Sequence, residues 1–106
     1  MYVKEAKHRQ LLMAVLQDSR TNLPTIAVVC DAIAAEARFN IWFVANKDRG
    51  TVELMFDLVR EYEQLTDRCS EAIVTYQQDG DGETFRQSIQ LFTNELLRIM
   101  REKLPS

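Results

Sequence analysis

The chain has 106 residues, which is the size of a single domain that can bury a hydrophobic core. Hydrophobic residues make up 46% and charged residues 27%, which excludes bulk disorder, and the formal net charge of -3 argues against the phosphate attraction on which nucleic-acid binding depends. Three glycines and two prolines are too few for a β protein with many turns, so residues 1–106 are expected to form one all-helical domain.

The apolar segments predict neither an export signal nor a membrane span. The first apolar run, residues 11–16, is too short for a signal peptide. Residues 25–47 are long enough to cross a bilayer, but Asp31, Glu36 and Arg38 would then lie near its centre, where charges are costly. These features predict a cytoplasmic protein.

Both cysteines lie in apolar stretches of the sequence. Cys30 and Cys69 do not have the spacing of metal ligands or of a redox-active pair. We expect two buried, reduced thiols, as in a cytoplasmic protein, and a disulfide between them is the less favoured alternative.

Start and stop signals divide the chain into four helices. Their expected ranges are 3–17, 25–47, 52–78 and 84–103. Asn22 or Thr25 is expected to cap the second helix, and Gly50 is expected to end it. The turn D-G-D-G, residues 79–82, ends the third helix, and Thr84 is expected to cap the fourth.

The third and fourth helices have the clearest hydrophobic periodicity. Positions three and four residues apart form a heptad seam on the third helix: Met55, Leu58, Tyr62, Leu65, Cys69, Ala72 and Tyr76. The fourth helix carries a similar stripe: Phe85, Ile89, Phe92, Leu96 and Ile99. Because the turn between them is short, we predict an antiparallel hairpin of two long helices, on which the first helix packs with Leu12, Val15 and Leu16. The predicted fold is an all-α, four-helix, bundle-like domain.

The second helix is apolar on two roughly opposite faces. The first face contains Ile26, Cys30, Ile33, Ala37, Ile41 and Val44. The second face contains Val28, Ala32, Ala35, Phe39, Trp42 and Phe43. Between the faces lie two narrow polar seams, formed by Asp31 and Arg38 and by Glu36, Asn40 and Lys47. Such a helix has to be covered on both sides.

We interpret the second face of this helix as a contact surface for another polypeptide. An exposed stripe that holds Phe39, Trp42 and Phe43 would be larger than the apolar patches that monomers usually expose. Aromatic side chains with few charges are typical of the centre of an interface. The six residues of the second face are therefore predicted to bind a partner protein or a second copy of the chain. The alternative is that this helix is the central one, with the first helix on one side and the hairpin on the other.

No pattern in the sequence predicts a catalytic, cofactor or metal site. His8 is the only histidine, and because its neighbours lack the phosphotransfer pattern, we expect a solvated residue. Residues 79–83, D-G-D-G-E, resemble part of a calcium loop, but Gln77 and Ser88 stand where that loop needs acidic ligands. A turn followed by a helix start explains the segment better. With no nucleophile motif and no P-loop in the sequence, we do not expect an enzyme.

The remaining hypothesis is regulation by protein–protein contact. Bacterial anti-activators that sequester transcription factors are similar in size and helical character. We therefore predict a homodimeric adaptor or anti-activator that occludes a partner protein, such as a transcription factor, without binding nucleic acid or a membrane directly. The alternative is a small-molecule-binding or sensor domain similar to the C-terminal part of TetR-like regulators. Its ligand would lie among Trp42, Met55, Tyr62 and Tyr76.

Overall fold

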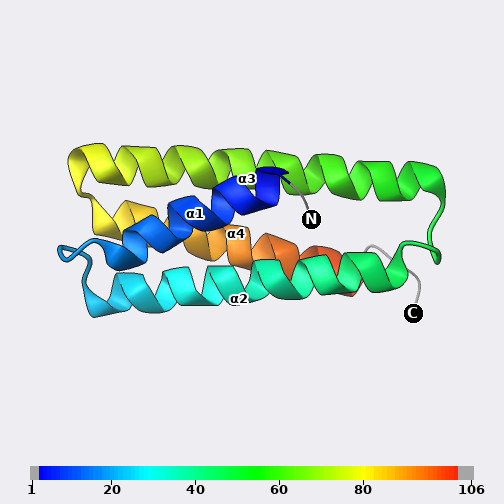
Figure 1. The fold of residues 1–106 in the computed structure, drawn as a ribbon, viewed down its shortest axis with the longest axis horizontal. Helices are drawn as coiled ribbons and strands as arrows, with labels where there is room; N and C mark the ends of the chain where they lie inside the picture. Colours follow the sequence, from blue (N-terminus) through cyan, green and yellow to red (C-terminus); the bar gives the residue numbers. More distant parts are fainter. Residues whose placement is uncertain (1–2, 103–106) are drawn as a thin grey trace.

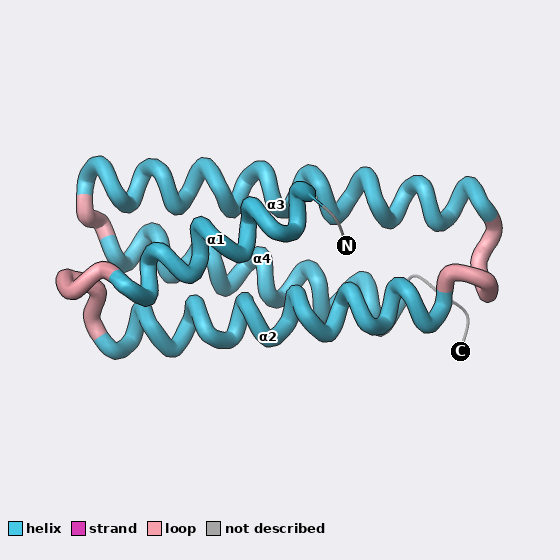
Figure 2. The backbone as a smooth tube through the Cα atoms, in the orientation of Figure 1, coloured by secondary structure: helices cyan, strands magenta, loops and turns pink. Residues whose placement is uncertain are grey.

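The computed structural model describes residues 3–102, and their side chains from Lys7 onward, as four α-helices without a β-strand (Figures 1 and 2). The helices are α1 (Val3–Gln17), α2 (Leu23–Asn46), α3 (Val52–Asp79) and α4 (Gly82–Glu102). The prediction of an all-α fold with four helices is confirmed. None of these four helices is both long and apolar enough to span a membrane.

The helices pack side by side in an elongated bundle that measures 44 × 23 × 18 Å. α1 and α4 lie at opposite corners, and each of them packs against both α2 and α3. α1 and α3 run in one direction and α2 and α4 in the other, so α3 and α4 form the predicted antiparallel hairpin (Figure 1). The most extensive contact joins α2 to α4, which run parallel to each other.

The core contains the predicted stripes of α3 and α4. All five residues of the α4 stripe are buried. Four residues of the α3 seam are also buried, namely Leu58, Tyr62, Leu65 and Cys69, and the other three pack against the core from its edge. α1 adds Leu12 and Val15, which are buried as well. The heptad spacing on α3 and α4 therefore predicted correctly which side of each helix faces inward.

Side chains of neighbouring residues cap the helix ends. The Asn22 side chain accepts a hydrogen bond from the backbone N–H of Thr25 at 3.0 Å, and Thr51 accepts one from Leu54 at 3.1 Å. Gly80 ends α3 with a φ of 74°, a left-handed conformation that is inexpensive only for glycine.

The predicted start of α4 is wrong by two residues. α4 begins at Gly82, and Asp81 rather than Thr84 supplies the cap. The Asp81 carboxylate accepts hydrogen bonds from the backbone N–H of Thr84 at 3.2 Å and from its hydroxyl at 2.7 Å. A carboxylate just before the first turn satisfies a backbone donor there and also meets the positive end of the helix dipole.

α1 covers only half of the length of the bundle. Its 15 residues span about 22 Å, whereas the 28 residues of α3 span about 42 Å. α1 starts near the middle of α3 and runs toward the end at which α2 begins (Figure 1). We call the part of the bundle under α1 the covered half. The other part, around residues 41–61, is the open half, and there no described helix lies between α2 and α3 on the α1 side.

Candidate functional site

The six residues predicted as an interface lie on the inner side of α2. Three of them are buried in the core, namely Ala32, Ala35 and Phe39. The other three are partly buried and pack against that core, namely Val28, Trp42 and Phe43. The expectation that this face stands exposed is therefore wrong, because other helices of the same chain cover it. A contact between a partner and the three partly buried residues stays a prediction.

The other apolar face of α2 is mostly exposed, although Ile26 and Ile33 are half-buried and Ile33 packs against the core. Ile41 and Val44 have exposed fractions of 72% and 60%. Cys30 is exposed as well, so the prediction of a buried thiol is wrong for Cys30 and right for Cys69. Both cysteines are free thiols. Because the two faces of α2 are similarly apolar, hydropathy alone does not determine which of them faces inward.

A buried polar cluster joins α1, α2 and α3 beside the inner face of α2. One oxygen of Glu36, Oε2, accepts hydrogen bonds from Nδ1 of His8 on α1 at 2.7 Å and from the Tyr62 hydroxyl on α3 at 2.8 Å. The exposed fraction of each of the three residues is 2% or less. The prediction that His8 is solvated is therefore wrong, and Glu36 does not lie on a wet edge of α2. Their mutual hydrogen bonds allow both polar side chains to be buried.

Aromatic rings enclose this polar cluster. The ring of His8 lies 4.9 Å from the ring of Phe92 on α4, and the ring of Tyr62 stacks on that of Phe39 at 5.1 Å. The second ring nitrogen of His8, Nε2, is buried and has no hydrogen-bond partner among the described residues. The cluster therefore brings all four helices together at one level of the bundle.

The surroundings of the cluster favour the protonated forms of the Tyr62 hydroxyl and the Cys69 thiol. Burial raises the pKa of the Tyr62 hydroxyl, and the carboxylate of Glu36 raises it further. Burial likewise raises the pKa of the Cys69 thiol to about 12, and Glu36 again adds to the shift. A buried thiol that keeps its proton is a poor nucleophile, and a substrate has no access to it. The three hydrogen-bonded residues of the cluster hold α1, α2 and α3 together from within the core.

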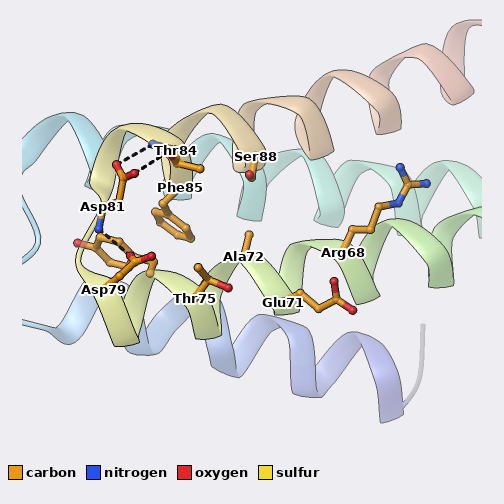
Figure 3. Close-up of a pocket in the computed structure, with 10 residues that line it drawn as sticks. Arg68, Glu71, Ala72, Thr75, Asp79, Asp81, Thr84, Phe85 and Ser88 are labelled. Carbon is orange, nitrogen blue, oxygen red and sulfur yellow. Dashed lines mark hydrogen bonds between the residues drawn. The ribbon is translucent and has the colours of Figure 1, made fainter.

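A polar cleft lies between α3 and α4 near the turn that joins them. Its volume is about 310 Å³, and Figure 3 shows Asp79 and Asp81 at its turn end and Arg68 at the other. Phe85 forms part of its wall and stacks on Tyr76 at 4.4 Å. The hydrogen bonds from Thr84 to Asp81 lower the pKa of this carboxyl group, so its charge serves the helix cap. The cleft holds no histidine or cysteine, and the Thr84 hydroxyl that donates to Asp81 forms part of the helix cap.

An apolar groove of about 300 Å³ opens between α2 and α3 in the open half. It is lined by Phe43, Lys47, Gly50, Val52, Met55, Phe56 and Val59. Phe56 and Val52, both on α3, are 66% and 72% exposed. Large apolar side chains that are this exposed and lie side by side are typical of a surface that binds another molecule. Phe43 is the residue that this groove shares with the interface predicted from the sequence.

The sequence contains a signal for the groove that lies largely outside the heptad seam. Val52, Met55, Phe56 and Val59 follow the spacing i, i+3, i+4, i+7, which places them on one side of a helix. Only Met55 belongs to the predicted seam. The first two turns of α3 are therefore apolar over a wider arc than the rest of the helix. The additional apolar residues, Val52, Phe56 and Val59, line the groove.

No group of three or more histidine, cysteine or acidic side chains within the described residues is arranged to hold a metal ion. No protein-family model, curated protein or solved structure matches this chain. Geometry and chemistry alone therefore identify the apolar groove as the candidate site.

Proposed function

We propose that this protein is a small regulatory interaction module that captures an amphipathic helix of a partner protein in the groove of the open half. The observation that carries the proposal is the pair of exposed apolar residues, Val52 and Phe56, at the wall of a 300 Å³ groove. A transcription regulator remains our proposed partner, and the protein would act by occluding the captured helix as an adaptor or anti-activator.

The groove continues the track that α1 occupies in the covered half. On α2, Glu36 faces α1, and Phe43 follows it seven residues later on the same side of the helix. Lys47, the residue that ends α2, comes four residues after Phe43 and also lines the groove. On α3, Thr66 is buried, and Val59 and Val52 precede it at intervals of seven. A helix bound in the groove would therefore pack against the continuation of the same sides of α2 and α3 that α1 contacts. This continuity supports a helix as the occupant.

The dimensions and the charge of the groove narrow the choice of occupant. The length that α1 leaves uncovered is about 20 Å, which a helix of about 14 residues spans. Apolar residues at i, i+3 or i+4, and i+7 would meet Phe43, Met55 and Phe56. Lys47 lines the groove beside them, so an acidic residue at one end of the bound helix would complement it.

Selection of binding peptides tests this proposal directly. A displayed library of helical peptides of about 14 residues is selected on the intact protein, and the affinity of the selected peptides is then measured. We expect apolar residues at helical spacing and an acidic residue in the selected set. Phe56→Asp should weaken their binding by at least about tenfold, because it places a charge at the centre of the contact.

Leu91→Asp is the matched control, since Leu91 is 55% exposed but lies on α4, at the corner opposite α1. It should leave peptide affinity unchanged. If the selected peptides bind Phe56→Asp as tightly as the original protein, the groove is not the site. If a long-chain fatty acid raises the thermal stability of the original protein but not of Phe56→Asp, and no peptide is selected, the groove binds a small apolar ligand instead.

A further inference from the structure

The outer side of α2 carries an uninterrupted apolar seam. Seven residues alternate at spacings of four and three along the whole helix: Leu23, Ala27, Cys30, Ala34, Ala37, Ile41 and Val44. All seven are exposed, and Leu23, Ile41 and Val44 are among the most exposed large apolar residues of the described chain. This seam overlaps the first apolar face of the sequence but follows a strict heptad.

The seam points away from the core of its own chain. Thr25, Ala32 and Phe39, which take the heptad position opposite to it, are all buried. An a/d seam with seven apolar positions in succession is the pattern by which one helix packs against another at a shallow angle. Three alanines in this seam would allow the two helix backbones to approach closely.

Two opposite charges flank the centre of the seam on one edge. Asp31 and Arg38 follow seam positions directly, and both line the cleft between α2 and α4. They are seven residues apart, which separates their backbones by about 10 Å along the helix. Within the described part of the chain, the structure shows no ion pair for either residue. Their charges are therefore available to a neighbour.

We propose that the outer seam of α2 binds the same seam of a second copy, antiparallel and about a two-fold axis. In one register Ala34 lies opposite Ala37 of the second copy, and Cys30 lies opposite its Ile41. The same register brings Asp31 next to Arg38 of the second copy, and the symmetry repeats this ion pair on the other side of the axis. Six of the seven seam positions pair with each other in this register, because Ala27 lies opposite Val44, and the flanking charges pair as well. Leu23 lies beyond the end of the seam of the second copy.

A parallel arrangement lacks this complementarity. In a parallel pair with the seams in register, Asp31 would face Ile26 of the second copy, and Arg38 would face its Ile33. Both charges would then lie against apolar side chains without a partner. The antiparallel pair also sets the two helix dipoles against each other, which is favourable. The positions of Asp31 and Arg38 therefore select the antiparallel dimer.

The proposed dimer is independent of the proposed function of the groove. The seam and the groove share no residue, and the seam faces outward from α2 whereas the groove opens toward the track of α1. A helix pair about 36 Å long and about 10 Å wide is small for a stable interface. We therefore expect a reversible dimer whose population rises with protein concentration.

Sedimentation equilibrium over a concentration series up to about 1 mM measures the dimer directly. The full chain should change from monomer to dimer over this range. Ala34→Glu should leave it monomeric, because it places a charged side chain where two alanines meet. Val74→Glu is the control on α3, since Val74 is also exposed, and it should not change the association. A purely monomeric original chain, or a dimer that survives Ala34→Glu, would overturn the proposal.

Charge exchange tests the register of the dimer. Asp31→Arg and Arg38→Asp should each weaken the dimer by roughly tenfold, because each turns two attractions into two repulsions. A mixture of the two variants should form a heterodimer, since the introduced arginine of one variant then faces the introduced aspartate of the other. At the symmetric position, the original Arg38 of the first variant faces the original Asp31 of the second. Circular dichroism verifies that each variant is folded. If the mixture associates no better than either variant alone, the antiparallel register is wrong.

Discussion

The two halves of the bundle have similar inner surfaces on α2 and α3 and differ in what covers them. In the covered half, α1 places His8 over Glu36 and Tyr62, and all three are buried. In the open half, the continuation of the same sides of α2 and α3 ends in Phe43 and Phe56, with no described helix above them. The presence of α1 is what makes one surface core and leaves the other a groove.

A stripe of apolar residues therefore does not itself determine burial. Phe39 and Phe56 are both aromatic residues on long helices, yet Phe39 is fully buried and Phe56 is 66% exposed. Removing a buried aromatic side chain in the covered half should therefore lower the free energy of unfolding more than removing an exposed one in the open half.

Phe39→Ala should have the largest effect, because the ring is fully buried and stacks on Tyr62 in the covered half. Removing a buried phenylalanine side chain costs about 3–5 kcal/mol of the free energy of unfolding. Urea unfolding followed by circular dichroism measures this cost. Leu91→Ala, at an exposed position, serves as the control and should cost less than about 0.5 kcal/mol. Similar costs for the two variants would show that this side of α2 is not core.

Glu36→Ala should lower the free energy of unfolding by about 3 kcal/mol, because it leaves the buried Nδ1 of His8 and the hydroxyl of Tyr62 without their shared acceptor. Tyr62→Phe removes only one donor, and the carboxylate keeps its bond to His8, so this variant should cost about 1 kcal/mol. Chemical unfolding of both variants provides the comparison. A cost for Tyr62→Phe as large as that for Glu36→Ala would contradict the central role of the carboxylate.

The parts of the fold that could be predicted from the sequence are those with one apolar side per helix. α3 and α4 each carry a single stripe, so periodicity identified both the helices and their buried residues, such as Leu58 and Ile89. The cap residue Asn22 follows from short-range chemistry, because its side-chain oxygen only has to reach an amide three residues ahead.

The orientation of α2 could not be predicted, because both of its sides are apolar. The residue that distinguishes them is Glu36, and its partners His8 and Tyr62 lie 28 and 26 residues away in the sequence. Each of these polar residues looks like a surface residue when it is considered alone. Their burial is favourable only because they hydrogen-bond to one another in the folded protein. Since Glu36 then faces the core, Cys30 lies on the exposed side of α2.

Alkaline pH should weaken the covered half. The pKa of the Cys69 thiol is raised to about 12 in the folded protein from an ordinary value of 9.0, so the folded state holds its proton more tightly than the unfolded state does. The stabilisation is fully present below pH 9 and is lost as the pH rises toward 12. At a pH of about 10.5 the free energy of unfolding should have fallen by about 2 kcal/mol.

Urea unfolding at a series of pH values measures this loss, and Cys69→Ala provides the control. The variant has no thiol to ionise at this position, so its stability should depend less on pH over this range, with Tyr62 accounting for the dependence that remains. An equally steep decline in the variant would assign the loss to other groups.

Phe56→Ser should have the smallest effect on stability, because most of this side chain already contacts water in the folded protein. The free energy of unfolding should change by less than about 0.5 kcal/mol. The same substitution should nevertheless reduce the binding of an apolar fluorescent dye, since it removes the largest exposed side chain of the groove. Val74→Ser is the matched control, because Val74 is exposed on α3 but does not line the groove. If Phe56→Ser destabilised the protein as strongly as Phe39→Ala, Phe56 would belong to the core, and the open half would be as closed as the covered one.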